Sequence, residues 1–326
     1  MESRLPPATK AWRWYLMVLG VVVGAIAALN AVPAVYEPAP RAVEHLPARS
    51  SDMAATVLVF VIVLAGVVGL GLAAGFVRNR RRLLSGGRPR IQPQVPLLAL
   101  LVFLVAKAVL ELCFATAILV STLDSESNLG ATVHLTGQIA TLVAAFALAM
   151  RVLRWLTSVT NEDAREIGFH PIALTKAVGW GIGGYCAAIP IAYGSAAAVY
   201  WLYRTFSGQA AVPQHPIVPE MLKGTPAFVV AVTLAVVAAP VVEETVFRGM
   251  LYSALRAVIG TWGASVLSAA VFALVHPTSP IMFVPLLALG IVFAILREST
   301  GSLAPSMVCH AANNAVMIAL ARLTCG

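Results

Sequence analysis

The chain has 326 residues, of which 60% are hydrophobic and only 11% are charged, and its formal net charge is +8. A soluble domain carries about 25% charged residues, so this chain has too few to cover a surface that faces water. Repeated apolar runs of about 20 residues are instead the signature of membrane-spanning helices. The composition therefore excludes a soluble enzyme and predicts an all-α fold, a polytopic transmembrane helical bundle.

Apolar segments long enough to form helices recur along the whole chain. They cover residues 13–35, 53–77, 95–121, 130–152, 177–203, 225–247, 262–276, 281–297 and 303–322. The last three are short for a full crossing of the bilayer. We therefore expect about eight or nine spans.

Much of the positive charge lies in one block, "RNRRRLLSGGRPR" at residues 78–90, directly after the second apolar segment. Lysine and arginine are enriched in cytoplasmic loops, so the block places the end of the second span in the cytoplasm. Two spans separate this block from the N-terminus, which is therefore predicted to be cytoplasmic as well. Membrane topology accounts for the net charge, and we expect the lipid bilayer rather than a nucleic acid as partner. The composition, rich in Ala and Val, points to the plasma membrane of a bacterium.

The distribution of polar residues predicts three parts. Residues 1–160 form an N-terminal transmembrane region with four predicted spans and the cytoplasmic basic loop at 78–90. Residues 161–224 contain a linker, the fifth span and an outer loop. Residues 225–322 hold nearly all the groups that suggest chemistry, and ionisable groups within apolar runs are costly in a membrane and usually functional. We expect this last part to be the catalytic core.

Three apolar helices of this core each carry polar side chains. The first reads "PVVEETVFRG", the second ends in "FALVH" and the third contains "CHAANN". Acid, imidazole and amide groups on three separate helices predict one convergent site. The residues are Glu243, Glu244 and Arg248 on the first helix, His276 on the second, and His310, Asn313 and Asn314 on the third.

Helix geometry divides the work between the two adjacent glutamates. Glu244 and Arg248 are four residues apart, so they can form an ion pair along one helix face. Glu243 is rotated by about 100° from Glu244 and points elsewhere. This predicts that the Glu244–Arg248 pair is structural and that Glu243 is the working carboxylate, a general base.

A helical hairpin would bring a histidine to this carboxylate. Gly260 marks the turn between the sixth and seventh segments, and Glu243 lies 17 residues before it while His276 lies 16 residues after it. Two antiparallel arms of equal length end at the same depth. We therefore expect Glu243 and His276 to meet.

One carboxylate, two imidazoles and an amide suit the activation of a water molecule. In one route, a zinc ion is held by His276, His310 and Glu243 or Asn314, with one position open for water. In the other, Glu243 and a histidine polarise the water without a metal. In both routes the remaining histidine or Asn314 stabilises the oxyanion.

The three segments resemble the motifs of the CPBP family. "EETVFR" matches EExxxR, "FALVH" matches FxxxH and "HAANN" matches HxxxN, and the flanking "RGMLYSALR" and "TGSLAPSMVCHAANN" are similar too. The family comprises type II CAAX prenyl endopeptidases, bacteriocin-processing enzymes and abortive-infection membrane proteins. The resemblance covers residues 225–322.

The resemblance implies an intramembrane endopeptidase that acts on a membrane-associated, lipidated or small peptide. It implies Glu243 as the water-activating glutamate, His276 and His310 as the motif histidines, and Asn314 as an asparagine that helps to hold the oxyanion. The structural positions of the motifs are Glu244, Arg248, Phe272 and Asn313. The alternative is a non-catalytic immunity or scaffold protein of the same fold.

Overall fold

The structure is a computed structural model, and it describes residues 91–121, 127–207, 217–276 and 282–325. Within these ranges the regular elements are helices, apart from one isolated β-bridge between Phe169 and Ser302. The predicted all-α class is therefore confirmed for the described residues. The predicted spans at 13–35 and 53–77 and the basic loop at 78–90 lie outside them.

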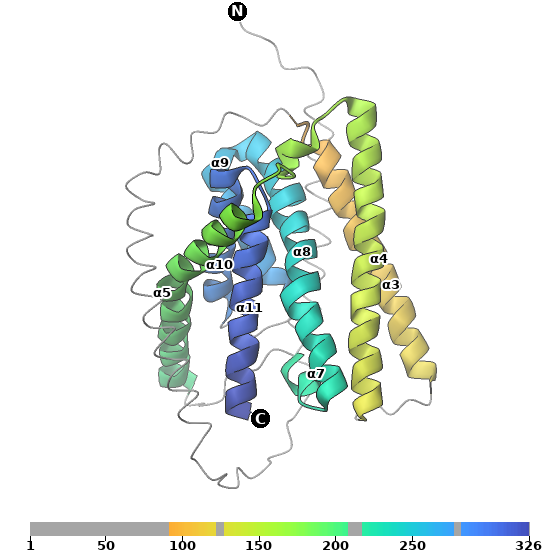
Figure 1. Cartoon of the computed structure of the whole chain (residues 1–326), viewed down its shortest axis with the longest axis vertical. Helices are drawn as coiled ribbons and strands as arrows, with labels where there is room; N and C mark the ends of the chain where they lie inside the picture. Colours follow the sequence, from red (N-terminus) through yellow and green to blue (C-terminus); the bar gives the residue numbers. More distant parts are fainter. Residues whose placement is uncertain (1–90, 122–126, 208–216, 277–281, 326) are drawn as a thin grey trace, which may run out of the picture.

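From residue 94 onwards the helices follow the predicted apolar segments (Figure 1). Their bounds are α3 (Gln94–Val120), α4 (Asn128–Thr160), α5 (Leu174–Ser207), α6 (Ile217–Met221), α7 (Thr225–Val232), α8 (Ala239–Glu244), α9 (Tyr252–Val275), α10 (Phe283–Thr300) and α11 (Ala304–Cys325). The described part also contains a 3-10 turn and two π-helical segments. These are η2 (Ala164–Ile167), η3 (Thr233–Ala238) and η4 (Thr245–Leu251).

In the described ranges, five helices are long and apolar enough to cross a membrane. They are Gln94–Ile118, Asn128–Thr160, Leu174–Phe206, Thr225–Val275 and Phe283–Thr300. The predicted total of eight or nine spans is not confirmed, and α11 is not among the five. Large apolar side chains such as Val105, Leu112 and Leu148 are nevertheless exposed, as expected for helices that face lipid. These features support a multi-pass membrane protein.

The fourth of these segments is folded back on itself rather than straight. Gly260 interrupts α9 with a φ of 74° and a ψ of 178°. A positive φ of this kind strongly favours glycine, which has no Cβ to clash. The chain after Gly260 returns along the chain before it, so that the rings of Phe247 and Phe272 lie 5.3 Å apart. The helical hairpin predicted from the sequence is confirmed, with its turn where the glycine predicted it.

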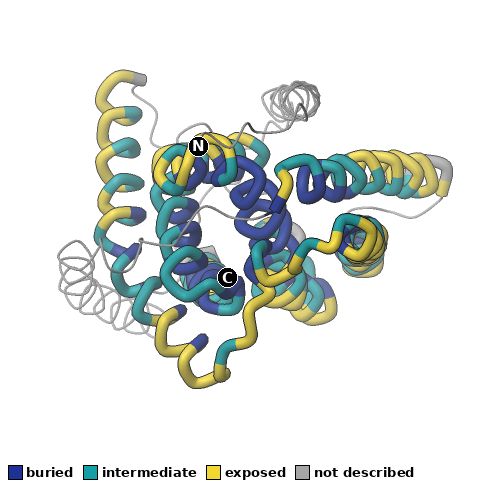
Figure 2. The backbone as a smooth tube through the Cα atoms, turned by 90° about the horizontal axis from the view of Figure 1, so that it is seen from above, coloured by how far each residue is buried: buried dark blue, intermediate teal, exposed yellow. Residues whose placement is uncertain are grey.

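The other helices surround this hairpin. α3 packs against α4, and α4 packs against α7 on one side of the hairpin. On the other side, α10 and α11 contact both the hairpin and α5. Buried residues gather where the helices face one another, and exposed residues lie on the outward faces (Figure 2). Glu244 and Arg248 of the hairpin are accordingly enclosed by protein.

π-Helical segments lie on both sides of α8. The backbone N–H of Ala239 donates to the carbonyl of Leu234, and that of Tyr252 donates to the carbonyl of Phe247, each five residues back. Such segments are rare and occur frequently at functional sites. Here they enclose the short helix that carries the two adjacent glutamates.

Candidate active site

The predicted ion pair between Glu244 and Arg248 is confirmed. Nη1 of Arg248 donates to Oε1 of Glu244 at 3.1 Å, and both side chains have no exposed surface. The guanidinium also lies over the rings of Phe272 and Phe293, at 4.3 and 4.9 Å from their centroids. These cation–π contacts compensate in part for the water that the buried arginine has lost.

A glycine on α10 makes room for this arginine. A Cβ at Gly290 would lie 2.9 Å from Nη2 of Arg248 and 2.7 Å from the Cβ of Ala269. Both distances are shorter than real contacts allow, so α10 can approach the hairpin this closely only with glycine at position 290. The charged pair is thus enclosed on the α10 side by backbone.

His310 reaches the same carboxylate from α11. Its Nδ1 lies 3.0 Å from Oε1 of Glu244, and its ring stacks on Phe293 with 5.0 Å between centroids. Because a carboxylate only accepts, Nδ1 carries the hydrogen and Nε2 faces away from Glu244. Glu244 therefore binds the arginine and also orients the histidine, a second role that sequence spacing does not reveal because the partners lie on different helices.

His276 is oriented in the same way by a backbone carbonyl. Its Nδ1 lies 2.7 Å from the carbonyl oxygen of Phe272, which can only accept. In the neutral histidine, Nε2 therefore carries a lone pair. This Nε2 lies 3.5 Å from Oε2 of Glu243, so the meeting predicted from equal hairpin arms is observed.

Glu243, His276 and His310, called here the Glu243 cluster, converge on one point. Nε2 of His310 lies 3.9 Å from the same Oε2 of Glu243. That oxygen is buried and has no hydrogen-bond donor within the described part of the chain. With both histidines neutral, three lone pairs face one another, and a small molecule with two hydrogens or a cation is the natural occupant.

Phe272 lies at the centre of the cluster and is 1% exposed. Its ring lies 4.2 Å from the ring of His276 and 5.8 Å from that of His310. The same residue supplies the carbonyl that orients His276. Phe272 therefore holds both imidazoles while contributing no reactive group of its own.

The two asparagines of α11 do not join this cluster through the hydrogen bonds that the structure gives them. Nδ2 of Asn314 donates to the carbonyl of Ala235 at 2.8 Å. Nδ2 of Asn313 donates to Oδ1 of Asn314 at 3.3 Å. Asn314 lies one helical turn beyond His310, as predicted, but its amide faces η3.

The residues predicted as zinc ligands carry suitable donor atoms. In addition, Nδ1 of His276 and Nδ1 of His310 each donate to an oxygen, as the second nitrogen of a metal-bound histidine usually does. In the described ranges, however, no group of three or more His, Cys, Asp or Glu side chains has the arrangement of a metal site. The zinc site stays a prediction, and the steps proposed below use side chains alone.

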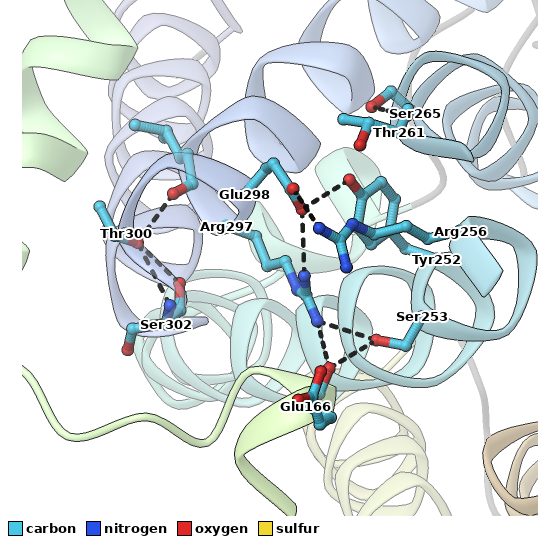
Figure 3. A network of polar contacts seen from close by, with 11 residues as sticks. Glu166, Tyr252, Ser253, Arg256, Thr261, Ser265, Arg297, Glu298, Thr300 and Ser302 are labelled. Atoms are coloured by element: carbon cyan, nitrogen blue, oxygen red, sulfur yellow. Dashed lines mark hydrogen bonds and ion pairs between the residues drawn. The ribbon is translucent and has the colours of Figure 1, made fainter. Parts of the chain in front are cut away.

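A second buried polar cluster joins side chains of α9 and α10 with η2 (Figure 3). Glu298 accepts hydrogen bonds from Tyr252 at 2.9 Å, Arg256 at 2.7 Å and Arg297 at 3.3 Å. Arg297 also donates at 2.5 Å to the backbone carbonyl of Glu166, so the cluster ties η2 to α9 and α10. We call these residues the Glu298 cluster. Sequence reasoning missed it, because charged residues at the end of an apolar helix usually face water.

Residues 225–316 match the family model for Rce1-like proteins, described as type II CAAX prenyl endopeptidase Rce1-like. No curated protein and no solved structure gave a match. The matched range contains all three motifs, and it confirms the resemblance drawn from them. Together, the motifs and the match identify residues 225–316 as an Rce1-like domain of the CPBP family of intramembrane proteases.

Proposed function

We propose that this domain is an intramembrane endopeptidase that hydrolyses a peptide bond with a water molecule activated by Glu243 and a histidine. The observation that carries the proposal is the unsatisfied Oε2 of Glu243, which lies 3.5 and 3.9 Å from the Nε2 atoms of His276 and His310. A water molecule can donate one hydrogen to the carboxylate and the other to an imidazole. The family match supports the class of reaction.

Glu243 acts first, as a general base. It takes a proton from the water while the water oxygen forms a bond with the carbonyl carbon of the substrate. His276, fixed through its Nδ1, accepts the second hydrogen bond of the water and sets the direction of attack. General-base catalysis of this kind contributes about 10²- to 10⁴-fold to a rate.

His310 acts on the tetrahedral intermediate. Glu244 holds its Nδ1–H, and Nε2 takes up one proton from solvent when the substrate binds. The imidazolium donates this Nε2–H to the oxyanion and keeps the proton until the products leave, when it returns to solvent. Aligned donors of this type stabilise the charge that develops in the transition state. The C–N bond then breaks, and the proton held by Glu243 passes to the amine nitrogen of the leaving peptide.

The substrate that we propose is a membrane-associated peptide, either lipidated or small. Glu243 lies within, and His276 directly follows, a segment that is apolar enough to cross a bilayer, which supports delivery of the substrate through or along the membrane. The side chains of Glu243 and His276 are 26% and 16% exposed, whereas His310 is only 5% exposed. A peptide would therefore approach from the side of Glu243 and His276.

Purified protein in lipid nanodiscs, incubated with a library of plain and prenylated peptides, tests the proposal by mass spectrometry of the products. We expect cleavage by the wild-type protein and none by Glu243→Gln. Cleavage that persists in the variant contradicts the role of Glu243. A folded wild-type protein that cleaves no peptide in either half of the library favours the non-catalytic immunity or scaffold alternative.

Elemental analysis of the same preparation addresses the zinc route. Without a resident metal, activity survives dialysis against a chelator. One zinc per chain that is lost in His276→Ala would instead make the two Nε2 atoms and Glu243 its ligands.

A further inference from the structure

The carbonyl of Ala235 lies where the backbone register of the central helix breaks. At the end of the π-helical segment η3, the N–H of Ala239 donates to the carbonyl of Leu234, five residues back. The next pair in this register would join residue 240 to Ala235. Residue 240 is a proline, which has no N–H to donate. The register and the proline together leave the Ala235 carbonyl without its backbone donor.

Asn314 takes the place of the missing donor. Its Nδ2 lies 2.8 Å from the Ala235 oxygen, which is a normal hydrogen-bond length. Asn313 supports this orientation, because its own Nδ2 donates to Oδ1 of Asn314. The contact is half-buried, and a carbonyl shielded from water without a donor is costly, so this contact stabilises the break that Pro240 creates.

The bond also fixes α11 against the helix that carries the two glutamates. His310 and Asn314 lie one turn apart on α11, and they contact Glu244 and Ala235 on the other helix. Two contacts at different heights prevent rotation and sliding of one helix against the other. The separation between the Nε2 of His310 and the carboxylate of Glu243 depends on that alignment.

We propose that Asn314 is a positioning residue: its amide replaces the backbone donor removed by Pro240. The catalytic part of this inference rests on the proposed peptidase function, whereas the structural part does not. The amide acts through the helix: it holds η3 and α8 in register with α11, and so keeps the Glu243 cluster assembled.

A double-mutant cycle with Pro240→Ala tests whether Asn314 acts through the Ala235 carbonyl. We expect Asn314→Ala to lower kcat about 10- to 100-fold in the wild-type background, the range for displaced catalytic groups. In the Pro240→Ala background the new N–H at position 240 can satisfy the Ala235 carbonyl, so the same change should cost less than about threefold. Asn314→Asp, which keeps the shape but loses the donor, should follow Asn314→Ala. An equal loss in both backgrounds overturns the proposal, because the effect of Asn314 would then not depend on the Ala235 carbonyl.

Hydrogen–deuterium exchange in nanodiscs tests the same bond without activity. We expect Asn314→Ala to speed exchange in peptides from residues 233–244 at least threefold more than in peptides from α4, and Pro240→Ala to cancel the difference. Unchanged exchange at 233–244 overturns the inference, even if Pro240→Ala is itself inactive. If the exchange result holds while the wild-type protein cleaves no peptide, the inference about the bond stands and the peptidase function fails.

Discussion

Glu298 and Glu243 are both carboxylates enclosed by the same helical bundle, but their oxygens are satisfied differently. Both oxygens of Glu298 accept hydrogen bonds, from Arg256 on one side and from Tyr252 and Arg297 on the other. Oε2 of Glu243 is buried and faces two imidazole nitrogens, with no donor in the described part of the chain. One carboxylate is saturated by the protein, and the other is not.

Together with the two imidazole nitrogens that face Glu243, this difference separates a structural group from a reactive one. A buried charge is stabilising only when its partners are in place, and an unsatisfied acceptor costs about 1–3 kcal/mol or more. Glu298 meets that condition and joins η2, α9 and α10. Glu243 lacks such partners within the described part of the protein, so a bound water molecule or substrate supplies the missing hydrogen bond. We expect changes in the Glu298 cluster to affect folding and changes at Glu243 to affect chemistry.

The largest effect on stability is expected at the buried Glu244–Arg248 ion pair, which lies beside the Glu243 cluster. Arg248→Ala leaves Glu244 buried without its charged partner and removes the cation–π contacts with Phe272 and Phe293. Breaking a buried pair in this way costs about 3–5 kcal/mol. Reversible unfolding in mixed micelles, or the yield of folded protein, measures the loss.

Arg322 provides a matched control for this change. It is exposed, and it lies over the single ring of Phe228 at 5.7 Å. We expect Arg322→Ala to change stability by less than about 1 kcal/mol. Equal stability of the two variants would show that the buried Glu244–Arg248 pair does not stabilise the fold.

Two tyrosines test whether the Glu298 cluster is structural. Tyr252→Phe removes a 2.9 Å bond to the buried carboxylate of Glu298, and hydrogen bonds to charged groups contribute about 1.5–3 kcal/mol. Tyr193→Phe removes only long contacts, 3.3 Å to Tyr185 and 3.5 Å to Met317, and should cost about 0.5 kcal/mol or less. Thermal unfolding followed by circular dichroism compares them. A larger loss at Tyr193 than at Tyr252 would remove the case for the Glu298 cluster as a stabilising element.

A smaller effect is expected from the glycine beside Arg248. Gly290→Ala forces α10 away from Ala269 and the guanidinium, and overpacking of this kind costs about 1–3 kcal/mol. Gly179→Ala is the control, because a Cβ there meets nothing within 4 Å. In a helix that change should be neutral or stabilise by up to about 1 kcal/mol. The unfolding midpoint of Gly290→Ala should therefore lie clearly below that of Gly179→Ala. Equal midpoints would contradict the close packing at Gly290.

For the described residues, the sequence was sufficient to predict the long helices and the central hairpin. The apolar runs of the sequence predicted the helical segments, because the thickness of the bilayer core sets a minimum length for a spanning helix. Gly260 gave the turn, and equal arm lengths gave the meeting of Glu243 with His276, which the structure has at 3.5 Å. Spacing by four residues gave the Glu244–Arg248 pair. Each of these follows from local geometry alone.

The contacts between helices could not be predicted in this way. The bond from His310 to Glu244 joins residues 66 positions apart, and no spacing rule connects them. The Glu298 cluster depends on how α9 meets α10, and the π-helical register at η3 decides that the Asn314 amide reaches Ala235. Spacing places Asn314 one turn from His310 on the same helix, but packing between helices determines which group its amide contacts.

The central claim is that Glu243 serves the chemistry and Glu298 serves the fold. Glu243→Gln and Glu298→Gln, prepared side by side, can be compared for peptide cleavage per folded molecule and for thermal unfolding. The account predicts that Glu243→Gln loses cleavage by about 10²-fold or more with its unfolding midpoint unchanged, whereas Glu298→Gln unfolds at lower temperature but still cleaves. Retained cleavage by Glu243→Gln, or a silent Glu298→Gln, would contradict it.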